Sequence, residues 1–167
     1  MYKLLLGPAF DFLPSSLRAL HQSPGTYRFS GTCTIRRDSS LVTRLLAFVA
    51  SLPPAGTSGI EVTIESYGKG EVWTRQFGAH RMQSTLQARD NRLHESIGFI
   101  NFIFELVVDQ RRLRWNLVEV RTFGIKIPKQ WFNLDVSEYD IDGRYCFNVE
   151  VHVHTVGLLV HYAGWLQ

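Results

Sequence analysis

Arg75 is the residue of this sequence best placed to do chemistry, because the pattern around it puts a permanent charge on the inward face of a predicted strand. Trp73 and Phe77 stand two residues before and after it, and alternate side chains of a strand point to the same face. An inward guanidinium must be paired or face a wet cavity, since an unpaired buried charge is very costly. We therefore expect Arg75 either to form a structural ion pair or to anchor the polar end of a mostly apolar ligand.

Glu95 is the candidate partner of Arg75, two predicted strands further along the chain. It shares a face with Leu93 and Ile97 by the same alternation. Perturbed buried ions occur both in structural pairs and in functional sites, so both interpretations stay open. If Arg75 anchors a ligand, Arg75→Ala should weaken ligand binding more than it lowers stability, and paired melting and binding assays would test this.

Aromatic side chains are the candidates for the wall of a pocket, since Phe, Trp and Tyr make up 13% of the chain. Large aromatic residues equally fill solid cores, so their presence alone does not make a site. The full set of predicted ligand-binding residues is Trp73, Arg75, Phe77, Glu95, Trp115 and Trp131.

Three histidines near the C-terminus have the types and spacing for a metal site. His152 and His154 share one face of a predicted strand, and His161 lies on the next strand, with Glu150 as another possible ligand. The alternative is a solvated outer face, because that face is otherwise polar and offers no clear supporting partners for metal ligands. We favour the solvated face and expect neither a metal nor another cofactor.

Other motifs do not support catalysis. The Gly68-Lys69-Gly70 segment lies between two predicted strands, where it makes a hairpin; a phosphate loop needs a following helix. The segment 140–143 faintly resembles a calcium loop but lacks its later acidic ligands, so we interpret it as a turn. The sequence contains no Gly-x-Ser-x-Gly elbow and no cysteine in a recognisable catalytic context. A non-enzymatic role is favoured.

The elements that must position these residues are strands, and the stretch 71–120 is the centre of the fold. Period-2 alternation and tight turns predict an antiparallel meander here, with further strands before and after it. We therefore predict an α+β fold: a strongly curved antiparallel sheet or open barrel of about nine or ten strands, covered by two helices. The predicted strands are 26–37, 60–67, 71–77, 81–88, 93–97, 99–108, 113–120, 136–141, 145–153 and 157–166.

The two predicted helices precede and follow the first strand. Apolar residues at helical spacing indicate a helix over 10–21, with Pro14 in its first turn. The start signal Asp38-Ser39-Ser40 predicts a second helix over 41–51, before a proline pair. The apolar segment 123–132 is predicted to cross one end of the sheet as a lid.

Composition indicates one domain covering all 167 residues. The net charge of +3 is mild and the basic residues are scattered, which argues against a nucleic-acid partner. Two cysteines make no disulfide framework and fit a reducing cytoplasm. The N-terminal apolar run is too short for a signal peptide, and the absence of a run of about 18 apolar residues predicts no membrane span.

Five segments, distributed in order over nearly the whole chain, carry a family resemblance: 52–56, 73–78, 124–128, 143–147 and 157–166. Together they resemble an uncharacterised bacterial family, the domain of unknown function 4166. Members occur alone or behind a saccharopine-dehydrogenase-like Rossmann domain, which implies an accessory or substrate-binding role beside a dinucleotide enzyme. This chain has no Rossmann fingerprint, and the family offers no assigned catalytic residues to transfer.

The leading functional prediction is a binding module that holds a small apolar or lipid-like ligand on the concave face of the sheet. One alternative is the accessory or substrate domain of a dinucleotide-dependent oxidoreductase, with a Rossmann-type reductase as partner. Another is a structural or interaction domain with a solid core. A cavity beside Arg75 would favour the binding module over the structural or interaction domain.

Overall fold

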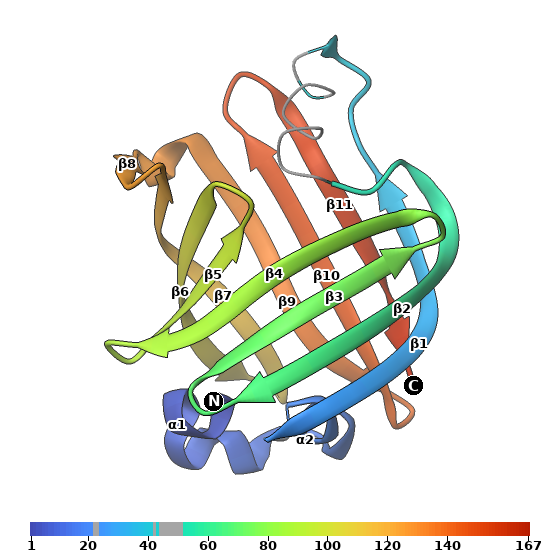
Figure 1. Ribbon diagram of the computed structural model, residues 1–167, viewed down its shortest axis with the longest axis vertical. Helices are drawn as coiled ribbons and strands as arrows, with labels where there is room; N and C mark the ends of the chain where they lie inside the picture. The colour runs from blue at the N-terminus through green and yellow to red at the C-terminus, as the bar shows by residue number, and fades with distance from the viewer. Residues whose placement is uncertain (22–23, 42, 44–51) are drawn as a thin grey trace.

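Ten antiparallel strands form a closed barrel, and an eleventh lies beside it (Figure 1). The computed structural model describes residues 1–21, 24–41, 43 and 52–167. Each barrel strand pairs with its neighbours, and the β7–β9 and β1–β11 pairings join the C-terminal strands to the rest of the barrel. The strands are β1 Gly25–Arg36, β2 Gly56–Tyr67, β3 Gly70–Phe77, β4 His80–Arg89, β5 Arg92–Ile97, β6 Ile100–Asp109, β7 Arg112–Thr122, β8 Ile125–Ile127, β9 Phe132–Ile141, β10 Arg144–Val153 and β11 Gly157–Leu166.

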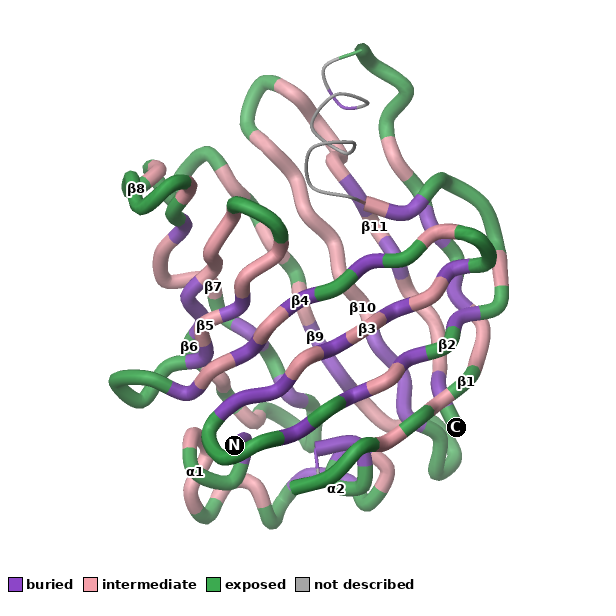
Figure 2. The backbone as a smooth tube through the Cα atoms, viewed as in Figure 1, coloured by how far each residue is buried: buried purple, intermediate pink, exposed green. Residues whose placement is uncertain are grey.

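The predicted α+β class is therefore confirmed, and the barrel is closed rather than open. Buried and exposed residues alternate along β2, β3 and β4, as Figure 2 shows. This alternation places one set of side chains inside the barrel and the other in solvent. Closure removes the exposed strand edges that an open sheet of this width would present.

Two strands begin earlier than the sequence predicts. β2 begins at Gly56, although 55–59 was expected to be a loop, because its first residues pair with the distal half of β1, from Gly31 to Ile35. β9 begins at Phe132 rather than at residue 136, and its first residues pair with the end of β10. In both cases a long partner strand determines the boundary, which local propensity does not reveal.

The N-terminal helices cover one end of the barrel (Figure 1). The predicted helix over 10–21 is divided into the 3-10 helix η1 Gly7–Phe12 and α2 Ser15–Leu20. Leu13 between them has extended backbone angles, as expected of a residue that precedes a proline. A further helix, α1 Tyr2–Leu6, was not predicted. The second predicted helix, 41–51, lies outside the described residues except for Leu41 and Thr43.

The predicted lid over 123–132 is wrong. Phe123 and Gly124 form a two-residue turn with φ values of 48° and 80°, which returns the chain alongside β7 as strand β8. The short 3-10 helix η2 Lys129–Trp131 then leads into β9. The segment thus forms a hairpin and turn at the rim of the barrel, beyond the end of the closed wall (Figure 1).

Gly31 and Gly164 allow β1 and β11 to approach closely. A Cβ atom at Gly31 would lie 1.8 Å from the carbonyl oxygen of Trp165, and one at Gly164 would lie 2.0 Å from that of Thr32. These contacts are with backbone atoms and cannot be relieved by rotating a side chain. Both positions therefore require glycine.

The two cysteines are free. Cys33 belongs to the core inside the barrel, and burial raises the pKa of its thiol to about 12. Cys146 alternates with the inward residues Tyr145 and Phe147, so it lies on the outer face of the wall. No helix within the described part of the chain is long and apolar enough to cross a membrane.

Candidate functional site

The barrel encloses a cavity beside Arg75. The residues that line it come from strands all around the barrel, from β2 to β11. Its wall is chiefly apolar, and its lining extends to Ile97, Ile100 and Phe132, at the ends of β5, β6 and β9. These strand ends lie on the side of the barrel away from the N-terminal helices (Figure 1). The residues around this end of the cavity, called its mouth, and along the upper wall include Ile97, Ile100, Phe102, Phe132, Leu134, Val136, Val149 and Val151.

Arg75 is both paired and exposed to the cavity. Its Nη1 donates a hydrogen bond to Ser84 Oγ at 2.9 Å, and its Nη2 lies 3.7 Å from Glu95 Oε1. The guanidinium carbon also lies 4.9 Å from the centroid of the Trp73 ring, within cation–π range. The predicted Arg75–Glu95 pair is therefore confirmed as an ion pair. A guanidinium carries five N–H donors, so these contacts leave donors able to meet a group in the cavity.

A second buried pair, the hydrogen-bonded His21 and Glu138, was not predicted. His21 Nε2 lies 2.5 Å from Glu138 Oε2, and the side chains are 0% and 5% exposed. His21 ends α2 and Glu138 points inward from β9, so the pair joins the N-terminal helices to the barrel. Alternation from Val136 could have placed Glu138 inward, but nothing in the sequence pairs it with a histidine 117 residues away.

Aromatic and polar side chains around this pair form the floor of the barrel. The Tyr2 ring stacks on the His21 ring with centroids 3.6 Å apart, and Trp73 Nε1 donates to Glu71 Oε2 at 2.8 Å. The Trp115 ring lies 6.3 Å from that of Tyr2. Four buried polar atoms here have no hydrogen-bond partner among the described residues: Tyr2 Oη, His21 Nδ1, Glu71 Oε1 and Trp115 Nε1. The floor is thus polar, whereas the upper wall is apolar.

Two tyrosines add hydroxyl groups to the inner part of the cavity. Burial raises the pKa of Tyr145 well above its usual value, and the nearby charge of Glu138 raises it further. Burial also raises the pKa of Tyr162 to about 12. Both line the cavity. The Tyr145 hydroxyl is hydrogen-bonded to Glu138, whereas the Tyr162 hydroxyl is protonated at neutral pH and can donate a hydrogen bond to a ligand.

Glu71 is a fully buried carboxyl group whose pKa is raised by desolvation. The folded state therefore binds a proton more tightly than the unfolded state, so this group lowers stability as pH rises from the unfolded pKa, about 4.3, through the raised folded pKa. We expect Glu71→Gln to be more stable than the original chain at pH 8, and this difference to shrink towards pH 4. The Gln oxygen can still accept the bond from Trp73.

Urea unfolding of both proteins across this pH range tests the expectation. Glu61→Gln is the matched control, because Glu61 is exposed on β2, and it should show no such pH-dependent difference. An advantage of Glu71→Gln that stays constant from pH 4 to pH 8 would contradict the assignment.

Four of the six predicted ligand-binding residues come together around the cavity: Trp73, Arg75, Glu95 and Trp115. Phe77 is buried and packs edge-on against Tyr162 but does not line the cavity. Trp131 is 53% exposed on η2, outside the barrel wall, so its predicted place in the pocket is wrong. It follows Pro128 in a turn, where strand alternation gives no information on direction.

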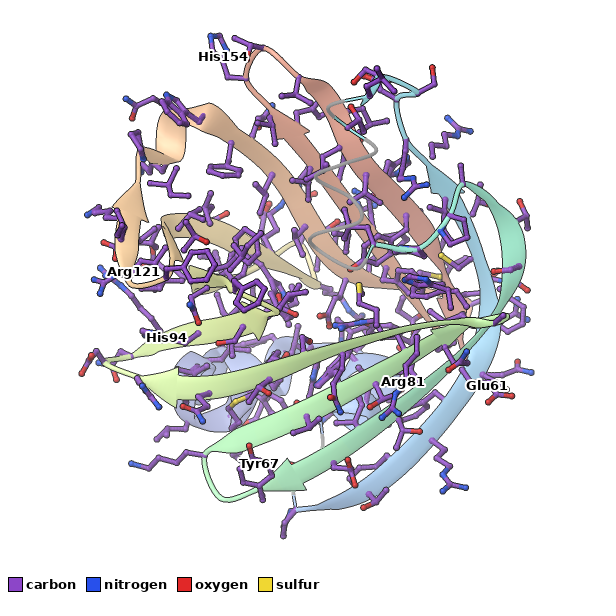
Figure 3. All side chains as sticks on the ribbon, turned by 45° about the horizontal axis from the view of Figure 1, so that its top comes forward. Glu61, Tyr67, Arg81, His94, Arg121 and His154 are labelled. Carbon is purple, nitrogen blue, oxygen red and sulfur yellow. The ribbon has the colours of Figure 1, made fainter. Side chains whose placement is uncertain are left out.

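The structure does not bring the three C-terminal histidines together as one ligand set. His152 Nε2 contacts Glu150 at 2.6 Å, and His161 Nε2 contacts Asn148 at 2.9 Å. His154 is exposed beyond the end of β10, as Figure 3 shows. Within the residues that the structure describes, no group of three or more His, Cys, Asp or Glu side chains is arranged to hold a metal ion.

The family model described as a domain of unknown function (DUF4166) matches residues 13–166, nearly the whole chain. The chain belongs to the DUF4166 family. The resemblance found in the sequence is thus confirmed, whereas the Rossmann-type reductase partner stays a prediction. None of the curated proteins matches this DUF4166 chain.

The fold of this DUF4166 domain is similar to a solved one. The crystal structure of Rv2717c from M. tuberculosis has a TM-score of 0.50 and 15% sequence identity, and the alignment covers 93% of this chain and 98% of that chain. At 15% sequence identity, this similarity shows a shared fold and gives no information on function. The ligand must therefore be argued from the cavity of this chain.

Proposed function

We propose that this DUF4166 domain is a binding module that holds a small, mostly apolar molecule inside the barrel. The observation that carries the proposal is the unfilled apolar interior with a charged group at its inner end. A solid core would leave no such space, because protein interiors are close-packed. Ligand pockets have this character, with apolar walls and a few fixed polar groups.

The polar groups favour an uncharged oxygen acceptor at one end of the ligand. Arg75 and the hydroxyl group of Tyr162 can donate hydrogen bonds. Two carboxylates, Glu95 and Glu138, also line the cavity, so an added anion would meet negative charge there. A carbonyl or hydroxyl oxygen accepts the donated bonds without that repulsion.

Fluorescence titration with Nile red, a neutral apolar dye with a carbonyl group, tests the proposal. The original chain should give saturable binding. Val149→Trp should abolish it, because Val149 lines the cavity and the larger ring occupies the ligand's space. Filling an existing cavity should change the unfolding free energy by no more than about 1 kcal/mol.

Val107→Trp is the matched control, since Val107 is 37% exposed on the outer face of β6. This variant should bind the dye like the original chain. Equal binding by Val149→Trp, or no saturable binding by the original chain, would contradict the proposal.

A further inference from the structure

A group of exposed apolar side chains surrounds the β8 side of the cavity mouth. This group, called the rim patch, consists of Phe99, Phe123, Ile125 and Trp131, which are 60%, 74%, 71% and 53% exposed. The Phe99 and Phe123 rings stack with centroids 4.9 Å apart. They come from two separate turns, so the fold brings them together in solvent. Trp131 lines a shallow hollow beside the β10–β11 turn. Exposed apolar groups of this kind can mark interaction sites.

The rim patch is continuous with the cavity mouth. Ile97 and Ile100 flank the turn that carries Phe99, and Phe132 follows Trp131, and all three of these neighbours line the cavity. β8 takes no part in closing the barrel, because it pairs only at the end of β7 (Figure 1). The hairpin therefore extends the rim without adding to the barrel wall.

Phe123 has an unfavourable backbone conformation for its type. Seven non-glycine residues have positive φ in the described part of the chain. Six of them are polar, and the seventh is Phe123, with a φ of 48°. A bulky side chain at positive φ is strained, whereas Asn and Asp tolerate that region. The ring recovers little of this cost by burial, because it remains largely exposed. Strain of this kind is typical of functional positions.

Basic side chains accompany the rim patch. Arg121, Lys126 and Lys129 lie on the same hairpin and turn, with one acidic residue, Glu119, among them. Arg121 and Lys126 both contact Glu119, and the Lys126 contact is 2.7 Å. The lysine side chain is still 68% exposed. Three cations against one carboxylate leave this face positive.

We propose that the rim patch docks on the surface of a bilayer that contains anionic lipids. Aromatic rings enter the headgroup region of bilayers, and nearby lysine and arginine side chains are attracted to anionic headgroups. A second copy of the chain is a poorer occupant, because a two-fold contact would place this positive face against itself. Docking would hold the cavity mouth against the lipid. The further step, that apolar ligands exchange there, rests on the proposed function.

Vesicle sedimentation tests the docking directly. We expect the chain to pellet with equimolar phosphatidylcholine–phosphatidylglycerol vesicles, and less with phosphatidylcholine alone or at high salt. Phe123→Asn should reduce partitioning about tenfold, because it removes one inserted ring. Its melting temperature should not fall, since Asn suits positive φ. Phe12→Asn is the control: Phe12 is 71% exposed at the helix-covered end and should not affect partitioning.

The charged residues give an independent test. In the double variant Lys126→Gln and Lys129→Gln, the affinity for the mixed vesicles should fall at least about fivefold. Its affinity for vesicles of phosphatidylcholine alone should change little. Failure of the original chain to pellet with mixed vesicles, or unchanged partitioning of Phe123→Asn, would overturn docking. Light scattering that shows a dimer lost in Phe123→Asn would assign the patch to self-association instead.

The two proposals fail separately. Phe123→Asn should bind Nile red normally without vesicles, because Phe123 does not line the cavity. An original chain that pellets with vesicles but binds no dye would contradict only the proposed function. One that binds dye but does not pellet would contradict only the docking.

Discussion

Replacing both members of the Arg75–Glu95 pair with uncharged residues, R75M/E95Q, is expected to weaken Nile red binding about tenfold or more. The charged donor at the inner end of the cavity is then absent, and a hydrogen bond from a charged group contributes about 1.5–3 kcal/mol. Dye titrations of the original chain and the double variant measure this loss. The apolar wall remains, so weak binding should persist.

The double variant separates binding from stability, which a single substitution cannot do. Arg75→Met alone leaves Glu95 buried without its counter-charge and should lower the unfolding free energy by about 3 kcal/mol. R75M/E95Q removes both charges and should lie within about 1–2 kcal/mol of the original chain, the lost bond to Ser84 included. Urea unfolding of the two variants measures this difference.

An exposed pair provides the matched control. Arg114 Nε lies 3.5 Å from Asp109, and these side chains are 44% and 53% exposed. R114M/D109N should alter the unfolding free energy by less than about 1 kcal/mol and leave dye binding unchanged. Full dye affinity in R75M/E95Q would assign Arg75 a structural role only.

His21→Ala should destabilise the protein by about 1–3 kcal/mol, because it leaves the buried Glu138 carboxyl group without its hydrogen-bond partner. It also removes the stacking contact with Tyr2, which helps hold the N-terminal helices to the barrel floor. Glu138→Ala should have a similar effect. The double variant should lose much less unfolding free energy than the sum of the two single losses, since either substitution breaks the same interaction. Urea unfolding of the three variants gives the coupling energy.

His152 provides the control for this prediction. It contacts Glu150 at 2.6 Å, but these side chains are 41% and 37% exposed. His152→Ala should change the unfolding free energy by less than about 0.5 kcal/mol. Additive losses for His21→Ala and Glu138→Ala would show that the two residues do not stabilise the fold as a pair.

Strand alternation was sufficient to predict much of the barrel wall. The inward directions of Trp73, Arg75 and Glu95 follow from a period of two, which is a local property of the chain. The closure of the barrel through the pairings of β1 with β11 and of β7 with β9 could not be predicted, because it depends on pairing between strands that no single turn connects. The rim hairpin was missed because its turn places Phe123 at positive φ, a conformation that bulky residues rarely adopt.

The polar floor of the barrel was also missed, because its residues are distant in sequence. Tyr2, His21, Glu71 and Glu138 meet only when the helices pack on the closed barrel. Glu71 could have been placed inward from the alternation that places Arg75, and Glu138 from Val136. Their contacts with Tyr2 and His21 arise from tertiary packing, which no local pattern encodes.

The most direct test of the central claim, that the barrel interior holds an apolar ligand, is methyl NMR mapping with 1-decanol, an apolar chain with an uncharged oxygen. We expect saturable shifts at the cavity methyl groups of Val136, Val149 and Val151 and none at Val107 on the outer wall. Saturating decanol with no change at the cavity valines, or shifts confined to exposed residues, would contradict it.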